Sequence, residues 1–355
     1  MRLNPGKKVK IDNISREVVF DLSDRLVSRS YVYLLFVFHH EGYQIYLKNN
    51  LHFIGNLISY SRAIAGLSRL KLYKKKEING RFLITDNPTD LNKKENKIIL
   101  SVKMFEKGKL RHRGSVIPFM MIPRLYFSGM FKTVSSLRST KRSMRIFFSG
   151  NSNRSLYNNQ NFNKLFGKLT RIEILDTIKQ NLRDSQLVCL NDLSRIKQNG
   201  FEDKFILSEW VRKKQNEKNL RGRTSDADWL KTLSHASFFL CCPGITQPMC
   251  HNLVEAMSVG TIPILEHSEF LNPSLTSGVN CITFSGKNDL IKKINQVLTM
   301  EESQIAKLRY GVLCYYDTYL TPKSIVKYLE SKKETGDIVY VIESSYFANL
   351  LNQYS

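Results

Sequence analysis

The stretch SDADWLKTLSHASFFLCCPGITQPMCHNLVEAMSVGTIPILE, residues 225–266, holds the features that decide the fold. The apolar run 238–241 predicts a strand that ends at Pro243-Gly244, a pair typical of a sharp turn. A helix over about 249–259 follows, and a second apolar run, 261–265, predicts the next strand. A strand, a helix and a strand in this order form one unit of a parallel sheet that is covered by helices.

The helix at 249–259 carries the chemistry of this stretch. Its first N–H groups have no partner within the helix, and together with the helix dipole they favour an anion such as a diphosphate. Glu255 lies one to two turns further in, where its carboxylate can accept hydrogen bonds from both hydroxyls of a ribose. At Pro243 and Gly244 the backbone can come close to a ligand. The stretch therefore predicts a nucleotide site at this edge of the sheet.

The run P-G-x6-H-N-x2-E-A-M-x2-G-T-I-P-I, residues 243–264, resembles the donor-site signature of GT-B glycosyltransferases. The most similar pattern is that of the exostosin-like and fucosyltransferase-like inverting enzymes. A weaker agreement in the order of elements extends over most of residues 140–330. The resemblance implies that Glu255 binds the ribose of a nucleotide-sugar donor, and that the loop before it, with His251 and Asn252, touches the base or the phosphates.

Two positions depart from the signature. Gln247 stands where many retaining relatives carry a second glutamate, which favours transfer with inversion. Asn252 stands where exostosin-like proteins often carry arginine, which leaves the exact family open. An ordinary joint between a helix and a strand, with Gly260 as the cap, would explain the second half of the motif without a ligand. It would not explain why Pro243-Gly244 and His251-Asn252 occur with it.

Strand and helix signals alternate over the rest of the chain as well. A basic, Ser-rich segment, 128–143, separates two such series and predicts a linker. We therefore expect an α/β protein with the GT-B fold, in which two Rossmann-like domains face a central cleft. The expected parts are an N-terminal acceptor domain over residues 1–140, a C-terminal nucleotide-sugar donor domain over 141–320, and a C-terminal helical tail over 321–355.

Two further groups of residues are candidates for phosphate contacts. Gly150 and Asn151 follow the first strand of the second series, where backbone N–H groups can meet phosphate oxygens, and Arg154 could add a bidentate contact. Arg221 and Arg223 flank a glycine and form a second candidate clamp. Polar turns with surface arginines remain the alternative for both groups.

An inverting transfer needs a general base that takes a proton from the acceptor hydroxyl. This base should lie in the N-terminal domain, at the carboxyl end of a strand that faces the cleft. Asp86 directly follows the strand expected at 81–85 and is our candidate. A plain Asp-Asn-Pro turn is the alternative interpretation of the same position.

No metal or other cofactor is expected. Asp226 and Asp228 match the D-x-D pattern with which another glycosyltransferase fold holds a metal, but Ser225 three residues before Asp228 indicates a helix cap instead. Cys241 and Cys242 lie in an apolar run, so buried reduced thiols explain them better than metal ligands do.

The net charge of +23 over 355 residues is the strongest feature of the composition. It would attract a nucleic acid, an anionic membrane or a phosphorylated acceptor, and a solvated surface rich in lysine is an equally good explanation. The apolar run 31–38 is far shorter than the roughly 20 residues that span a bilayer, and the first residues lack the apolar core of a signal peptide. We expect a cytoplasmic protein, with peripheral contact to the inner face of a membrane as a further expectation.

The expected function is that of a metal-independent, inverting glycosyltransferase in the synthesis of surface polysaccharide. It would move a sugar from a nucleotide-sugar donor to a glycan or a lipid-linked acceptor. One alternative is a nucleotide-sugar epimerase on the same fold, which needs no acceptor. Another is a basic nucleic-acid-binding protein, which the charge alone supports, since no helix-turn-helix, zinc-finger or RNA-binding signature is present. Nucleic acid is therefore not an expected partner.

Overall fold

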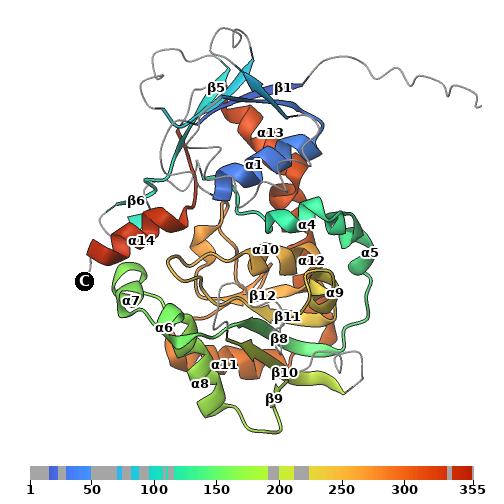
Figure 1. Ribbon diagram of the computed structural model, residues 1–355. Helices are drawn as coiled ribbons and strands as arrows, with labels where there is room; N and C mark the ends of the chain where they lie inside the picture. Colours follow the sequence, from blue (N-terminus) through green and yellow to red (C-terminus); the bar gives the residue numbers. More distant parts are fainter. Residues whose placement is uncertain are drawn as a thin grey trace, which may run out of the picture.

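The computed structural model contains two six-stranded parallel β-sheets, each covered by helices, and a separate two-stranded antiparallel sheet (Figure 1). It describes residues 16–22, 29–48, 70–73, 81–87, 96–106, 109–110, 116–190, 200–211, 224–333 and 338–353. Two α/β domains with parallel sheets, which meet at the cavity described below, form the GT-B arrangement. The predicted fold class is confirmed.

The first sheet has the strand order β14-β5-β4-β1-β2-β3, in which β14 is Ile338–Tyr340, and each neighbouring pair is parallel. The chain enters at β1, adds β2 and β3 on one side, and then returns to the other side of β1 with β4. Ligands of open α/β sheets bind at such a reversal, outside the carboxyl ends of the strands. The elements up to the second sheet are β1 (Glu17–Asp21), α1 (Arg29–His40), β2 (Gln44–Lys48), β3 (Leu70–Tyr73), β4 (Phe82–Thr85), β5 (Lys97–Ser101), β6 (Phe105–Glu106), β7 (Lys109–Leu110), α4 (Pro123–Phe127), η3 (Met130–Thr133) and α5 (Val134–Leu137).

Helix α1 shows why the run 31–38 is apolar without interruption. All eight of these residues are buried, so the helix has no solvent face over this length. It packs on the first sheet and on α13 (Pro322–Lys332), and its Tyr33 reaches the second domain. The helix ends at His40, and Gly42 follows with φ of 86°, a conformation that glycine adopts without strain.

The second sheet has the order β13-β12-β11-β8-β10-β9 and is also parallel throughout. The chain places β9 and β10 on one side of β8 and then β11, β12 and β13 on the other, so the strand order reverses between β8 and β11. Its elements are β8 (Met144–Asn151), α6 (Arg154–Tyr157), α7 (Gln160–Phe166), α8 (Arg171–Asn181), β9 (Leu187–Cys189), β10 (Phe201–Trp210), α9 (Trp229–Ser234), β11 (Ala236–Leu240), α10 (His251–Ser258), β12 (Ile262–Leu265), η5 (Ser268–Phe270), β13 (Ile282–Thr283), α11 (Gly286–Leu298), α12 (Glu302–Tyr315) and the π-helical turn η6 (Tyr316–Leu320).

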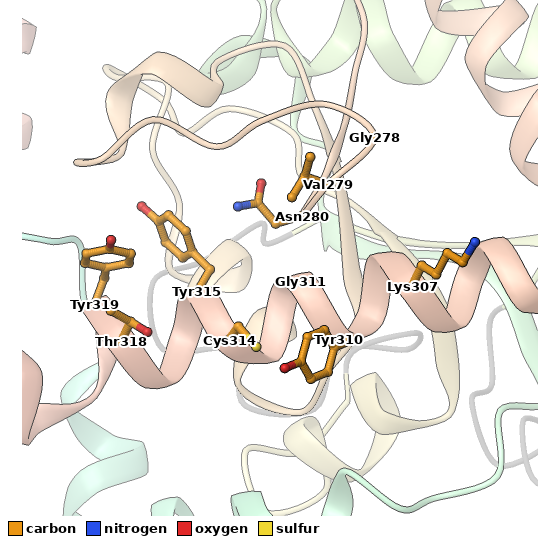
Figure 2. Close-up of a pocket in the computed structure, with 10 residues that line it drawn as sticks. All are labelled: Gly278, Val279, Asn280, Lys307, Tyr310, Gly311, Cys314, Tyr315, Thr318 and Tyr319. Atoms are coloured by element: carbon orange, nitrogen blue, oxygen red, sulfur yellow. The ribbon is translucent and has the colours of Figure 1, made fainter.

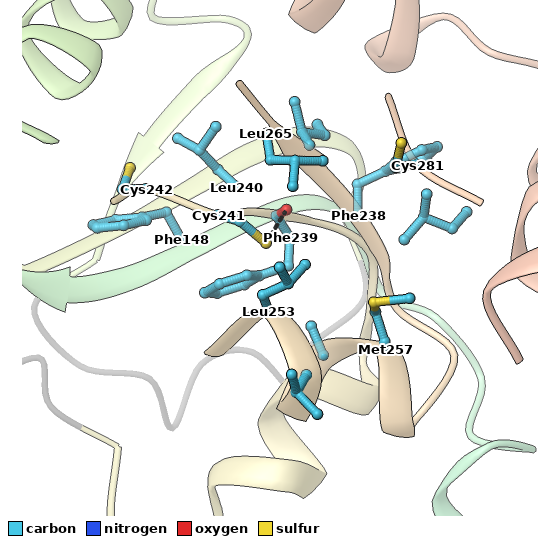
Figure 3. Close-up of a cluster of buried hydrophobic side chains, with 14 of the residues drawn as sticks. Phe148, Phe238, Phe239, Leu240, Cys241, Cys242, Leu253, Met257, Leu265 and Cys281 are labelled. Atoms are coloured by element: carbon cyan, nitrogen blue, oxygen red, sulfur yellow. Dashed lines mark hydrogen bonds between the residues drawn. The ribbon is translucent and has the colours of Figure 1, made fainter. Parts of the chain in front are cut away.

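The core of the second domain lies between α10 and the strands β8, β11 and β12 (Figure 3). Leu253 and Met257 of α10 pack against this sheet, and both are buried. Cys241 and Cys242 are buried beside them, as the sequence indicated. Burial raises the pKa of the Cys242 thiol to about 12, so this side chain stays a neutral thiol and packs as a small apolar group.

The segment after residue 321 differs from the helical tail that we expected. Helix α13 (Pro322–Lys332) packs beside α1, and α14 (Ser344–Gln353) lies near α7. Between them is a strand, β14 (Ile338–Tyr340), which pairs in parallel with β5 and becomes the edge of the first sheet (Figure 1). The β-branched and aromatic residues Ile-Val-Tyr suit a strand, and they cover an edge that would otherwise have unpaired backbone groups.

The expected linker at 128–143 also has regular structure. The short helices η3 and α5 occupy most of it, and Val134 is buried. Arg138 donates two hydrogen bonds to Asp317, which fixes the segment to the second domain.

Within the described part of the chain, no helix combines the length and the apolar composition needed to cross a membrane.

A buried histidine at the end of β12 gives the second domain a specific pH dependence. His267 is 2% exposed, and burial, with a smaller effect from Lys168, lowers its pKa from 6.5 to about 3. The unfolded chain takes up this proton below about pH 6.5, whereas the folded protein takes it up only near pH 3. The free energy of unfolding should therefore fall as the pH falls through this window, by about 1.4 kcal/mol per pH unit for one proton.

Denaturant unfolding of the wild type and of a His267→Leu variant, each between pH 7 and pH 4, measures this contribution. We expect the slope of the unfolding free energy against pH to be smaller in the variant, by the amount that the uptake of about one proton contributes. Parallel curves for the two proteins would contradict the assignment to His267.

Candidate functional site

A cavity of about 200 Å³ lies at the carboxyl edge of the second sheet. The ends of β8 and β10 line it, together with the loop before α10 and the start of that helix. The segment 122–124, which follows the first sheet along the chain, closes the opposite side. The lining residues are Ile122, Arg124, Ser149, Gly150, Asn151, Tyr157, Arg171, Trp210, Thr224, Asp226, Trp229, Cys250, His251, Asn252 and Glu255. The cavity thus lies at the switch point between β8 and β11, where this sheet type binds ligands.

Glu255 lines the cavity as a carboxylate that is 2% exposed. Its Oε1 accepts a hydrogen bond from the backbone N–H of Ile122 at 3.1 Å, and its Oε2 accepts one from the indole N–H of Trp229 at 2.6 Å. Trp229 itself is held by ring contacts with Phe147 and Phe239. Burial raises the pKa of Glu255, and the two N–H donors act in the opposite direction. Each oxygen keeps a further lone pair for a ligand.

His251, the first residue of α10, connects the two domains. Its Nδ1 lies 2.9 Å from the carbonyl oxygen of Met120, and its Nε2 lies 2.9 Å from the hydroxyl of Tyr33 in α1. Because a carbonyl only accepts, Nδ1 carries a proton, and in a neutral ring Nε2 would then accept from the Tyr33 hydroxyl. The ring also stacks on Phe119 with centroids 5.0 Å apart. These contacts orient the start of α10 towards the cavity.

Arg171 is a cavity residue that the sequence analysis missed. It is 6% exposed, its Nε and Nη2 donate to the carbonyl oxygen of Pro243, and its Nη1 donates to that of Asn151 at 3.0 Å. The guanidinium carbon lies 3.9 Å from the centre of the Tyr157 ring. Within the described part of the chain no carboxylate lies within 4.0 Å of it, so a full positive charge is held at the ends of β8 and β11 with two N–H groups to spare.

A sequence signal for Arg171 does exist. Thr170 and Glu173 form a capping box in which each side chain bonds to the backbone N–H of the other residue. The T-x-x-E pattern could have predicted that a helix begins at Arg171. In an α/β domain, a helix that leads from one parallel strand to the next begins at the carboxyl edge of the sheet.

The turn after β8 brings some of its predicted residues to the cavity and leaves one outside. Gly150 and Asn151 line the cavity, and a Cβ on Gly150 would lie only 2.8 Å from the Phe148 ring, so a larger residue would require this ring to move. Arg154 is not among the lining residues. Its guanidinium is bonded to Asp176 at 2.6 Å on the surface of α6 and α8.

The loop after β11 has a structural reason for its glycine. Gly244 donates its N–H to the carbonyl oxygen of Gln247, and a Cβ at this position would lie 3.0 Å from that oxygen. Neither Pro243 nor Gly244 is among the residues that line the cavity, but the carbonyl oxygen of Pro243 accepts from Arg171, which does. Asn252 lines the cavity at the start of α10.

Asp226 and Asp228 have different surroundings. Asp226 lines the cavity and forms an ion pair with Arg124 at 2.8 Å, while Asp228 exchanges two hydrogen bonds with Ser225 just before α9 begins at Trp229. Among the residues that the structure describes, no group of three or more His, Cys, Asp or Glu side chains gathers as metal ligands would. Arg221 and Arg223, the second predicted clamp, lie outside the described residues.

Asp86 directly follows β4, on the carboxyl edge of the first sheet. β4 is the strand where this sheet reverses, and all its neighbours are parallel, so Asp86 lies on the edge that carries the other strand ends. It is not among the residues that line the cavity. The assignment of Asp86 to the acceptor side of the site therefore depends on its position at the carboxyl end of β4.

Glu343, a second carboxylate on that edge, was also missed. It follows β14, it is buried, and it accepts a hydrogen bond from the N–H of Ser345. The neighbouring Ser344 bonds to Thr246 and Gln247 of the loop before α10, so this strand end lies against the second domain. No sequence signal pointed to Glu343, because nothing local shows that β14 joins the first sheet.

Neither a family model nor a curated protein sequence matches the chain. Several solved structures align with most of it. HepE of Anabaena in complex with UDP has a TM-score of 0.47 and 9% identity, over 88% of this chain and 97% of that chain. A glycosyltransferase from Rickettsia africae has a TM-score of 0.46 and 10% identity, over 91% and 99% of the two chains. The N-terminal domain of trehalose-6-phosphate phosphatase from Candida albicans has a TM-score of 0.47 and 9% identity, over 93% and 98%.

Proposed function

We propose that this chain is a glycosyltransferase that binds a nucleotide-sugar donor in the cavity between β8, β11 and α10. The observation that carries the proposal is the combination, around one cavity, of a buried cation with no carboxylate within 4.0 Å among the described residues, a helix N-terminus and a buried carboxylate. These are Arg171, the start of α10 and Glu255. Together they match the charge pattern of a nucleoside diphosphate, which has two anionic phosphates and a ribose that donates hydrogen bonds.

The diphosphate is proposed to lie between Arg171 and the first N–H groups of α10. Cys250, which precedes α10, makes no side-chain cap, so the N–H groups at the start of the helix can meet phosphate oxygens. The two uncommitted N–H groups of Arg171 would bind the same anion in a bidentate manner. This pair supplies the positive charge that a departing diphosphate needs, and for that reason we propose transfer without a metal ion.

The acceptor is proposed to be a glycan or a lipid-linked glycan, bound on the side of the first sheet. Asp86 is our proposed general base, and the transfer would proceed with inversion, in keeping with Gln247 at the position where retaining relatives have an acid. The net charge of +23 suits an acceptor at an anionic membrane on the cytoplasmic face. Surface polysaccharide is the product class that we propose.

Calorimetric titration with UDP, GDP, CMP and dTDP, followed by the sugar nucleotides of the base that binds, tests the proposal. We expect one base to bind clearly better than the others, and a thermal shift with it, since a ligand at 100 times its Kd adds about 2.7 kcal/mol of stability. A protein that binds none of them would contradict the proposal. A protein that isomerises the free sugar nucleotide without any acceptor would be an epimerase instead.

Replacing Glu255 by alanine should lower the affinity for the nucleotide at least tenfold, because a hydrogen bond to a charged group contributes about 1.5–3 kcal/mol. The same change leaves the N–H groups of Ile122 and Trp229 without their acceptor, which costs stability as well. A control must therefore separate loss of binding from loss of stability.

Glu266 offers a matched control in the same domain. It is also buried, and its two oxygens accept from the backbone N–H groups of Leu169 and Gly286, but it does not line the cavity. We expect denaturant unfolding to show a loss of about 2–6 kcal/mol for each alanine variant, from two unpaired N–H groups. Calorimetry should show weaker nucleotide binding only for Glu255→Ala. Equal nucleotide affinity in the two variants would mean that Glu255 has only a structural role.

A further inference from the structure

A groove on the outer face of the second domain lies between α12, the π-helical turn η6 and the turn 278–280 (Figure 2). It is open to solvent, has a volume of about 520 Å³ and shares no lining residue with the cavity at α10. Three tyrosines line it, Tyr310 and Tyr315 from α12 and Tyr319 from η6. The groove is therefore a second concave site, separate from the proposed donor site.

Exposed apolar side chains gather in the groove. Seven large hydrophobic side chains are exposed among the described residues, and three of them line this groove: Tyr310 at 72%, Val279 at 54% and Tyr319 at 39%. The ring of Tyr315 packs against that of Tyr319 with centroids 4.9 Å apart. Single exposed apolar residues are ordinary, but a cluster of them in a hollow marks a binding surface.

The walls of the groove are held in place by close packing. A Cβ on Gly311 would lie 2.1 Å from the carbonyl oxygen of Val279, so the turn rests directly on the backbone of α12. Tyr315 donates its hydroxyl proton to the carbonyl oxygen of Pro273, which fixes its ring. The chain then makes the π-helical turn that presents Thr318 and Tyr319. A preformed site of this kind loses little entropy when it binds a ligand.

Polar groups without a partner lie beside the rings. Among the described residues, no hydrogen bond or ion pair engages the side-chain nitrogen of Asn280, the hydroxyl of Thr318 or the ammonium group of Lys307. Figure 2 shows the Asn280 amide directed towards Tyr315. Lys307 lies at the end of the groove opposite to Tyr319. The groove thus presents flat apolar faces edged by hydrogen-bond donors.

We propose that this groove binds an oligosaccharide chain, with sugar rings stacked on Tyr310 and Tyr319. The C–H face of a pyranose packs on an aromatic ring, and its hydroxyls require donors and acceptors at the rim, which Asn280 and Thr318 supply. Lys307 adds a contact for an acidic sugar. The proposal rests on the proposed function for its choice of ligand, since a transferase that extends a glycan would gain from holding the chain outside the reaction site.

Saturation-transfer NMR with maltohexaose as the neutral probe and hexagalacturonate as the acidic probe tests the groove on the full chain. We expect binding at millimolar concentrations or better, weakened about tenfold or more in Tyr310→Ala and in Tyr319→Ala, since aromatic anchors dominate such contacts. Lys307→Gln should weaken the acidic probe only. Leu156→Ala removes an exposed side chain outside both sites and should bind like the wild type.

Nucleotide titration of the same variants separates this proposal from the proposed function. Tyr310→Ala and Tyr319→Ala should bind the nucleotide like the wild type, and Glu255→Ala should bind the oligosaccharides like the wild type. Wild-type binding of both probes by the two tyrosine variants, or binding of neither probe by the wild type, would overturn the oligosaccharide groove whatever the nucleotide result.

Discussion

Replacing Asp86 by asparagine is expected to lower the turnover number by about 10²–10⁴, which is what the loss of a general base costs. The carboxylate follows β4 at the point where the first sheet reverses, on the edge that meets the second domain. Asparagine keeps the size of the side chain and removes its basicity. Because Asp86 does not line the cavity at α10, the Kd of the nucleotide should not change.

Glu343→Gln is the matched control, since Glu343 also follows a strand of the first sheet, and its neighbour Ser344 bonds to the second domain. Both variants are compared by turnover number and by nucleotide affinity. A drop confined to Glu343→Gln would move the base to that residue, and full activity of both variants would reject Asp86 and Glu343 as the base.

The stereochemistry of the product tests the mechanism apart from the residue. The NMR coupling of the new anomeric proton should show a configuration opposite to that of the donor. A retained configuration would contradict direct displacement, and with it any role for Asp86 as a base.

The stretch 225–266 shows what the sequence could predict. Its helix was expected at about 249–259 and runs from His251 to Ser258, and Gly260 follows with φ of 75° as a helix-ending glycine should. These features depend on neighbours within a few residues, so the local pattern contains them. The alternation of strands and helices, and with it the fold class, follows from the same kind of information.

What the sequence could not predict depends on contacts between distant residues. Arg154 was chosen because it follows a glycine turn, yet it bonds to Asp176 on the surface, and Arg171 reaches the cavity instead. That choice depends on the position of the Pro243 carbonyl, 72 residues along the chain. The pairing of β14 with β5 and the contact of Tyr33 with His251 also depend on residues that are far apart in the sequence.

Replacing Arg171 by methionine is expected to lower the turnover number by about 10²–10³, the effect of removing one group that stabilises developing charge. The more specific readout is the ratio of affinities for a nucleoside diphosphate and for its nucleoside. Methionine fills part of the volume but carries no charge, so binding of the diphosphate should weaken much more than binding of the nucleoside.

Turnover of the wild type should persist in excess EDTA, because Arg171 and α10 supply the positive charge. Loss of turnover that manganese restores would contradict this.

Arg142 provides the matched control for loss of a buried guanidinium. It donates to the carbonyl oxygens of Ser234 and Val259 in the same domain, and burial, followed by a smaller effect from Arg309, lowers its pKa to about 9. It does not line the cavity. Arg142→Met should therefore lower the free energy of unfolding without changing the ratio of the two affinities.

Arg171→Lys separates charge from geometry. Lysine keeps the positive charge but has a single nitrogen, which cannot reach the carbonyls of both Pro243 and Asn151 and also bind an anion in a bidentate manner. We expect an affinity ratio between those of the wild type and Arg171→Met. If Arg171→Met has the wild-type ratio and is merely less stable, Arg171 only fastens the ends of β8 and β11 together. The diphosphate would then have to be held by the start of α10 without it.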